Sequence, residues 1–133
     1  MTKQTAARRT TLALEAFTVL GAVIGVQGFL SGSFDPLVED LSEAFALIDG
    51  PTIPALALGA LIGVPQGAAL VMGLRGSPRA PGAAIAVGAV LVGWVVAQYP
   101  LVGWGSPLQP AFAAVGAAEV ASALLWCRSV TAG

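Results

Sequence analysis

The stretch TLALEAFTVLGAVIGVQGFL, residues 11–30, decides the fold class, because only one of its 20 residues carries a charge. At about 1.5 Å per residue, a helix of this length covers about 30 Å, the thickness of the hydrocarbon core of a bilayer. The segment before it, MTKQTAARR, has the polar and basic character of a signal-peptide start. The apolar run is nevertheless longer than signal peptides use. We therefore expect this segment to be retained and to cross the membrane.

Three more apolar stretches follow, at approximately residues 54–74, 81–101 and 107–127, and each opens on a proline. Proline suits the first turn of a helix, because no backbone hydrogen bond is lost there. The chain is 56% hydrophobic and only 10% charged, which is under half of the charged share of about 25% in soluble domains. The sequence predicts one domain over residues 1–133, an all-α integral membrane bundle of four transmembrane helices.

The positive charges predict the orientation of this bundle. Every lysine and arginine lies before the first span, between the second and third spans, or after the fourth, and these residues are Lys3, Arg8, Arg9, Arg75, Arg79 and Arg128. With four spans, these three places share one face of the membrane. Under the positive-inside rule, both termini are expected in the cytoplasm, with the protein in the inner (plasma) membrane.

The first outer loop, residues 31–53, is predicted to carry a short amphipathic helix from Pro36 to about Ile48. Asp35 can cap this helix, and Pro36 suits its first turn. Apolar residues recur every three or four positions on one face, at Leu37, Leu41, Phe45 and Ile48. The other face is acidic, at Glu39, Asp40 and Glu43. This acidic face is either a solvated polar surface or a cap that attracts cations or docks a partner.

Glycines recur within the first two spans. Gly21 and Gly25 lie in the first span, and Gly59, Gly63 and Gly67 follow one another at four-residue steps in the second. In lipid, small residues let two helix backbones approach closely, so that van der Waals contact drives their association. These glycines are expected to serve helix packing, either within the chain or in a homo-oligomer or a complex with other membrane subunits.

A carboxylic acid, Glu119, stands within the apolar stretch AAVGAAEVASALLWCR, residues 113–128. Glu119 and Gln66 each lie eight residues before the inner end of their spans, so the two side chains are predicted to share one depth. Pro65 is expected to kink the second span, because it cannot donate a hydrogen bond to the carbonyl of Leu61. Broken helices and acids within a span are typical of transport sites.

Three interpretations of Glu119 follow from this pattern. A neutral Glu119 can hydrogen-bond Gln66 or the Leu61 carbonyl and thereby join two helices. Alternatively, it is a functional site that gains and loses a proton, or it is an acid tolerated at the lipid surface. Glu15, four residues into the first span, is expected nearer to the membrane surface, within reach of Arg8 or Arg9.

Composition also limits the chemistry. The chain has no histidine and one cysteine, which excludes histidine-based metal or haem ligation, histidine general bases and an intrachain disulfide. With a net charge of −1, no nucleic-acid partner is expected, and no cofactor, metal or catalytic residue is predicted. The leading interpretation is a non-enzymatic accessory or structural subunit, or an oligomeric scaffold, in the lipid bilayer. The alternative is a small proton- or cation-coupled transporter or channel that uses Glu119.

The segment LVGWGSPLQPAFAAVG, residues 101–116, enters the fourth span. With this segment, its length and its outer loop, the chain resembles small four-helix membrane proteins of high-GC bacteria such as actinobacteria, some of which are grouped as DoxX-like. The resemblance implies a four-helix bundle and no particular activity.

Overall fold

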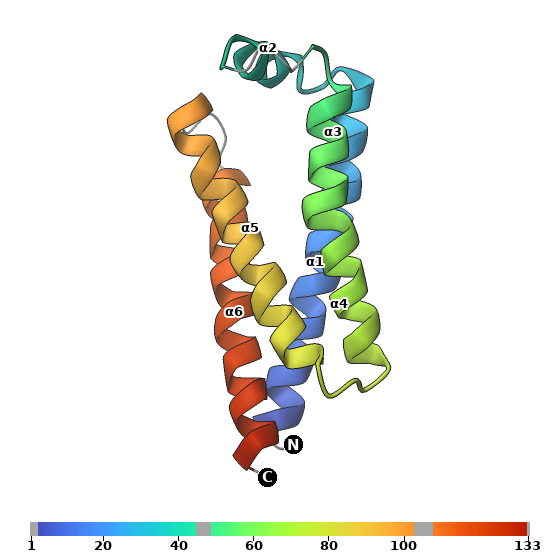
Figure 1. The fold of residues 1–133 in the computed structure, drawn as a ribbon, viewed down its shortest axis with the longest axis vertical. Helices are drawn as coiled ribbons and strands as arrows, with labels where there is room; N and C mark the ends of the chain where they lie inside the picture. The colour runs from blue at the N-terminus through green and yellow to red at the C-terminus, as the bar shows by residue number, and fades with distance from the viewer. Residues whose placement is uncertain (1–2, 45–48, 103–107, 133) are drawn as a thin grey trace.

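Helices make up nearly all of the computed structural model, which describes residues 3–44, 49–102 and 108–132 (Figure 1). The elements in chain order are α1 (Lys3–Ser31), α2 (Asp35–Ala44), α3 (Thr52–Leu58), the π-helical turn η1 (Gly59–Gly63), α4 (Val64–Leu74), α5 (Ala80–Val102) and α6 (Leu108–Ala132). Four helical segments are long and apolar enough to cross a membrane, namely Gln4–Ser31, Thr52–Leu74, Ala80–Gln98 and Gln109–Val130. The predicted all-α bundle of four transmembrane helices is therefore confirmed.

The second span is one continuous helical segment made of α3, η1 and α4. Within it, the backbone N–H of Val64 donates to the carbonyl of Gly59, five residues back, as in a π-helix. Pro65 follows directly and has no N–H to offer. A widened turn before a proline gives its ring room, and such turns are frequent at functional sites. The disturbance expected at Pro65 thus takes the form of a π-helical turn.

The two ends of the bundle differ in charge, because the lysine and arginine residues lie at one end and the acidic residues of α2 lie at the other. Both termini and the connection between α4 and α5 lie at one end of the molecule, and α2 lies across the other (Figure 1). The helix α6 packs against both α1 and α5, while α1 also packs against α3, η1 and α4. We refer to these ends as the terminus end and the α2 end.

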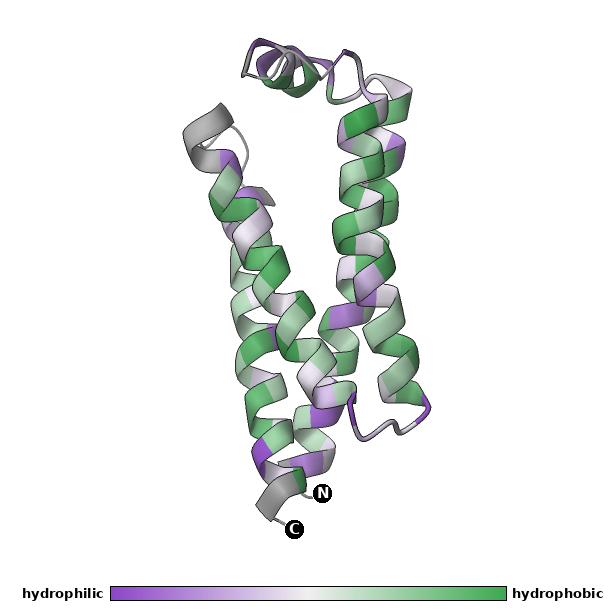
Figure 2. Ribbon diagram, in the orientation of Figure 1, coloured by the Kyte–Doolittle hydropathy of each residue, from purple (hydrophilic) through white to green (hydrophobic). Residues whose placement is uncertain are grey.

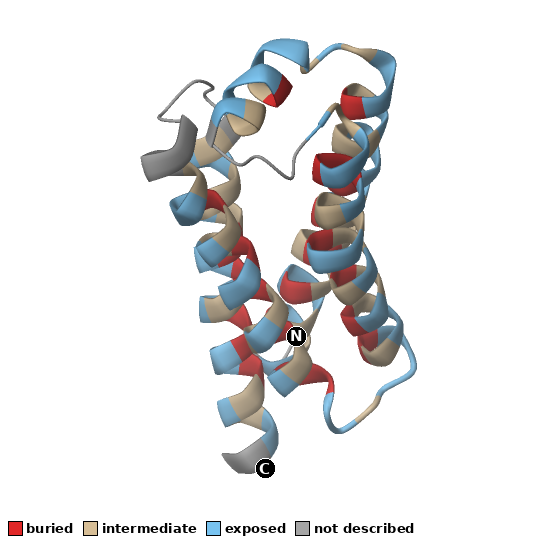
Figure 3. Ribbon diagram, turned by 45° about the horizontal axis from the view of Figure 1, so that its top comes forward, coloured by how far each residue is buried: buried red, intermediate tan, exposed pale blue. Residues whose placement is uncertain are grey.

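Apolar residues cover the outside of the four long helices, while polar residues gather at the ends and at points within (Figure 2). Large apolar side chains such as Leu20, Ile24 and Val64 are more than 60% exposed. Buried residues lie on the faces that the helices turn toward one another (Figure 3). An apolar exterior around a partly polar interior suits a lipid environment.

Two apolar clusters lie between the spans at different levels, and a third packs α2 onto α1 and α3. The terminus-side cluster joins three helices through Ala7, Ala80 and Trp126, with Met72 packed against them. The α2-side cluster consists of Ala22, Ile62, Leu91 and Val95, with partly buried neighbours that include Leu58, Trp94 and Phe112.

The predicted outer helix is present as α2, whose Asp35–Ala44 range agrees with the first part of the expected one. The expected end of this helix, with Phe45 and Ile48, lies outside the described residues. Val38 is buried against Phe29 of α1 and Ala55 of α3. The acidic residues of the opposite face, Glu39, Asp40 and Glu43, are exposed.

Two of the three glycines of the second span pack against α1. A Cβ atom at Gly63 would lie 3.4 Å from the Cβ of Ala22, and one at Gly59 would lie 3.6 Å from Cγ2 of Val26. Gly67 has no atom within 4 Å of its Cβ position, so its expected role in packing within the chain is wrong. It follows Gln66, which points inward, and successive residues of an α-helix point about 100° apart.

The two glycines of the first span also lie against other helices. A Cβ atom at Gly21 would be 2.7 Å from the ring of Phe112 on α6, and one at Gly25 would be 2.6 Å from Leu58 on α3. These side chains occupy the space that the glycines leave open. Packing within the chain therefore accounts for four of the five glycines that the sequence singled out.

Candidate functional site

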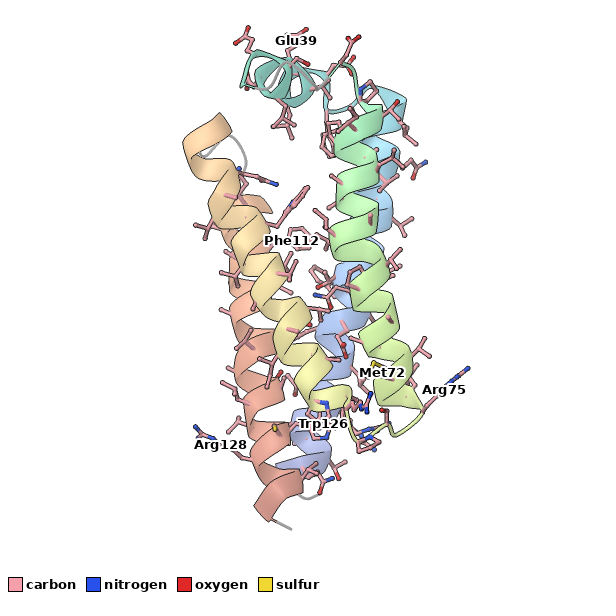
Figure 4. The ribbon with its side chains drawn as sticks, in the orientation of Figure 1. Glu39, Met72, Arg75, Phe112, Trp126 and Arg128 are labelled. Atoms are coloured by element: carbon pink, nitrogen blue, oxygen red, sulfur yellow. The ribbon has the colours of Figure 1, made fainter. Side chains whose placement is uncertain are left out.

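A cluster of buried polar side chains lies inside the bundle. Its members are each at most 7% exposed and come from three spans, with Thr11, Glu15 and Thr18 on α1, Gln66 on α4, and Glu119 and Ser122 on α6. We call these six residues the buried polar cluster. Along α6 it lies between Phe112 and Trp126, which Figure 4 labels. Polar and ionisable groups in a membrane bundle usually face its interior and mark functional sites.

Gln66 makes two hydrogen bonds that connect this cluster to neighbouring helices. Its amide nitrogen Nε2 donates to Oε2 of Glu119 at 3.1 Å and to the backbone carbonyl of Val87 on α5 at 3.3 Å. One side chain thereby connects α4, α5 and α6, and the predicted contact between Gln66 and Glu119 is confirmed.

Glu119 is fully buried, so the interpretation of an acid tolerated at the lipid surface is wrong. Its second oxygen, Oε1, is buried and has no hydrogen-bond partner. The carbonyl of Leu61, which was the alternative partner, does not bond this oxygen. Among the described residues, the hydrogen bond to the Glu119 carboxyl group comes from Gln66.

Glu15 is buried inside the bundle, whereas the sequence suggested a side chain that reaches the interface or pairs with Arg8 or Arg9. It is fully buried and neither of its oxygens has a hydrogen-bond partner. It lies one turn of α1 from Thr11, whose hydroxyl contacts that of Ser122, and Ser122 lies one turn of α6 from Glu119, so the two acids share one level of the bundle. The error arose at the start of the helix. Because α1 begins at Lys3, Glu15 lies 12 residues into it, at about 18 Å along the axis.

Arg8 does not pair with Glu15 either. Its Nη2 donates to the backbone carbonyl of Gly73 at 2.9 Å, which joins the start of α1 to the last turn of α4. The last carbonyls of a helix have no partner within it, and a cation there is favourable. Arg8 therefore bonds the end of α4 and not the carboxyl group of Glu15.

The hydroxyl groups of the cluster all have hydrogen-bond partners. Thr11 and Ser122 lie with their oxygens 2.8 Å apart, joining α1 to α6, and either hydroxyl could be the donor. Thr18 donates to the carbonyl of Leu14 at 2.8 Å. Sequence reasoning missed these residues. The signal was present, because residues 11, 15, 18 and 22 recur at the three- and four-residue steps that mark one helical face.

Four buried oxygen atoms of the cluster have no hydrogen-bond partner. They are both carboxyl oxygens of Glu15, Oε1 of Glu119 and Oε1 of Gln66. All four can accept hydrogen bonds, and no lysine or arginine belongs to the described buried residues. Leaving a buried polar group unpaired costs about 1–3 kcal/mol. Protons or another positive ion at these acceptors would remove that cost.

An apolar cluster lies on each side of the site along the bundle. On the terminus side, Ala7, Ala80 and Trp126 form an apolar layer, and on the α2 side Ala22, Ile62, Leu91 and Val95 form another.

The other predicted features lie apart from this cluster. Glu39, Asp40 and Glu43 are on α2, at the far end of α1 from its basic start. Pro65 is not a member of the cluster, but it directly precedes Gln66 in α4. Among the described residues, no three His, Cys, Asp or Glu side chains gather in a group that could hold a metal ion. Comparisons with protein-family models, curated proteins and solved structures found no match.

Proposed function

We propose that this protein is a small transporter or channel that takes up protons or other cations at Glu119 inside its helix bundle. The observation that supports this proposal is the set of four buried acceptor oxygens without donors, of which Glu119 contributes one. A bundle that needed only a structural hydrogen bond would gain nothing from additional unpaired acceptors, since each one is costly in the absence of water.

The apolar layers above and below the site fit the same proposal. A transporter exposes its site to one side of the membrane at a time, by moving one group of helices against another. Opening the layer at Trp126 would connect the polar cluster to the terminus end, and opening the layer at Leu91 would connect it to the α2 end.

We propose further that the terminus end faces the cytoplasm and that the membrane is the inner (plasma) membrane. The terminus end carries the lysine and arginine residues, whereas α2 at the other end carries Asp35, Glu39, Asp40 and Glu43. Positive residues remain on the cytoplasmic side during insertion.

Proton flux in liposomes tests the proposed role of Glu119. The purified protein would be reconstituted with a pH-sensitive dye inside, and flux would be driven by a potassium diffusion potential. Glu119→Gln keeps the shape of the side chain but cannot carry a proton, so we expect it to abolish the flux. Glu39→Gln, the same change on the exposed face of α2, is the control and should leave it unchanged. Wild-type flux in the Glu119→Gln variant would overturn the proposal.

An accessory or structural subunit, or an oligomeric scaffold with itself or other membrane subunits, is the second candidate function. The two hydrogen bonds of Gln66, which join three helices, favour it. In that case Glu119→Gln, which can still accept a hydrogen bond from Gln66, should assemble and function normally. Mass spectrometry of proteins that co-purify in mild detergent would then identify the assembly.

A further inference from the structure

We infer that Glu15 is a second proton-carrying residue of this site, and that Glu15 and Glu119 together take up two protons. The inference rests on the proposed function, because it concerns the same site, but it adds a residue from a different helix and a stoichiometry. Glu15 comes from α1 and Glu119 from α6, and Gln66 of α4 lies against Glu119.

The hydrogen-bond count supports two protons. The amide nitrogen of Gln66 is occupied by Glu119 and by the Val87 carbonyl, which leaves its oxygen Oε1 as an acceptor. The four unpartnered atoms are all acceptors. One proton on each carboxyl group converts two of them into O–H donors and leaves two acceptors. Donors and acceptors then match, whereas one proton leaves acceptors in excess.

The charge balance leads to the same number. If both acids were ionised, the interior would hold two negative charges, and the described buried residues include no basic side chain to offset them. A charge within the hydrocarbon region is costly. Two protons neutralise both carboxylates, while one proton or one monovalent cation leaves a net negative charge.

Divalent cations do not suit this site. They would balance the charge, but Ca²⁺ takes six to eight oxygen ligands and Mg²⁺ requires six, usually including several waters. The cluster has four oxygen atoms without partners, fewer than either ion requires, and apolar residues pack on both sides of it.

No other ionisable group faces this pair among the described residues. Glu15 is the one titratable side chain that α1 buries, and Glu119 is the one that α6 buries, while the buried residues of α4 and α5 include none. Arg8 is engaged with the carbonyl of Gly73. The protonation of the cluster is therefore set by these two carboxyl groups.

Infrared spectroscopy of the purified protein can test this inference. Protonated carboxylic acids have a carbonyl band that disappears when they ionise, and its loss would be followed as the pH is raised. We expect Glu15→Gln and Glu119→Gln each to remove about half of the wild-type band change, and the double variant to remove nearly all of it. Glu39→Gln is the control and should retain the full change.

Glu15→Asp tests whether loss of signal reflects loss of the acid. It keeps a carboxyl group on α1 and should keep a two-proton band change, which separates proton carrying from a fold that depends on glutamate. Helical content and elution volume would be compared for all variants. A full band change in Glu15→Gln would overturn the inference.

The same preparations show whether the bound ion is a proton or Na⁺, and they separate a failure of this inference from a failure of the proposed function. Replacing choline chloride with sodium chloride at fixed pH should leave the band unchanged, and its loss would show that Na⁺ displaces the protons and overturn the inference. If Glu119→Gln abolishes flux while Glu15→Gln changes neither flux nor band, the proposed function stands and the inference falls. If two carboxyl groups titrate but the wild type shows no flux, the proton pair stands and the proposed function falls.

Discussion

The backbones of α5 and α6 touch where Gly88 faces Gly116. A Cβ atom on Gly116 would lie 3.1 Å from the carbonyl oxygen of Gly88, and one on Gly88 would lie 3.2 Å from the carbonyl oxygen of Gly116. Small residues allow this approach, and close backbone packing is a main source of helix association in lipid. The crossing stands beside Val87 and one turn from Glu119, so it also sets the position of the polar cluster.

Gly116→Ala should destabilise the protein. The added methyl group would lie 2.8 Å from Cγ2 of Val92 as well as against the Gly88 carbonyl, so the two helices must separate. Overpacking of this kind typically costs about 1–3 kcal/mol. The measurement is the free energy of unfolding in detergent.

Gly93→Ala on α5 is the matched control for this prediction. Gly93 is exposed, and no atom lies within 4 Å of its Cβ position. Surface changes of this kind usually stay within about 0.5 kcal/mol. Equal stability losses in Gly116→Ala and Gly93→Ala would show that close packing at the crossing is not important.

The architecture could be predicted from the sequence because bilayer thickness fixes the length of a span. Residues 11–30 and the three later runs have that length, and the structure places a long helix over each. The depth of Gln66 and Glu119 followed from the same reasoning, because both spans run in the same direction and each residue lies equally far from the end.

The position of Glu15 could not be predicted in this way. The segment MTKQTAARR is polar, so the first span was expected to begin at residue 11, although the helix begins at Lys3. A polar flank does not stop a helix when it contains neither glycine nor proline. The crossing of Gly88 and Gly116 was also missed, since the pattern of one helix does not identify the helix that faces it.

Reporter fusions test the proposed orientation. A reporter that is active only in the cytoplasm should be active after the C-terminus and inactive within residues 42–50, which lie between the first two spans. The reason is that the lysine and arginine residues lie at the terminus end. Cytoplasmic activity of the loop fusion would contradict the proposed topology.

Arg8→Met should lower the stability of the terminus end. The change removes the 2.9 Å bond to the Gly73 carbonyl, and hydrogen bonds to charged groups contribute about 1.5–3 kcal/mol. Because Arg8 is only partly buried, we expect the lower part of this range, measured as the free energy of unfolding in detergent. Arg75→Met removes the same charge from the same end at an exposed position, and a similar loss there would mean that charge, and not the bond, is responsible.

Gln66 should contribute more to stability than Glu119, although the two residues bond each other. Gln66→Met leaves both Oε2 of Glu119 and the Val87 carbonyl without their donor. Glu119→Met leaves Gln66 its bond to Val87, and each of the two changes also removes one unpaired oxygen, Oε1 of the replaced residue. Losing a partner of a buried polar group is costly, whereas removing an unsatisfied group is not. We therefore expect Gln66→Met to be the more destabilising change.

A double-mutant cycle with Gln66→Met and Glu119→Met measures the bond itself. In membrane proteins such couplings average about 0.6 kcal/mol and reach about 1.7 kcal/mol, and the buried position of both residues favours the upper part of this range. Gln27→Met on the exposed face of α1 is the control for the substitution and should be nearly neutral. Additive effects of the two changes would mean that the 3.1 Å contact contributes little, and that the polar cluster is retained for a reason other than stability.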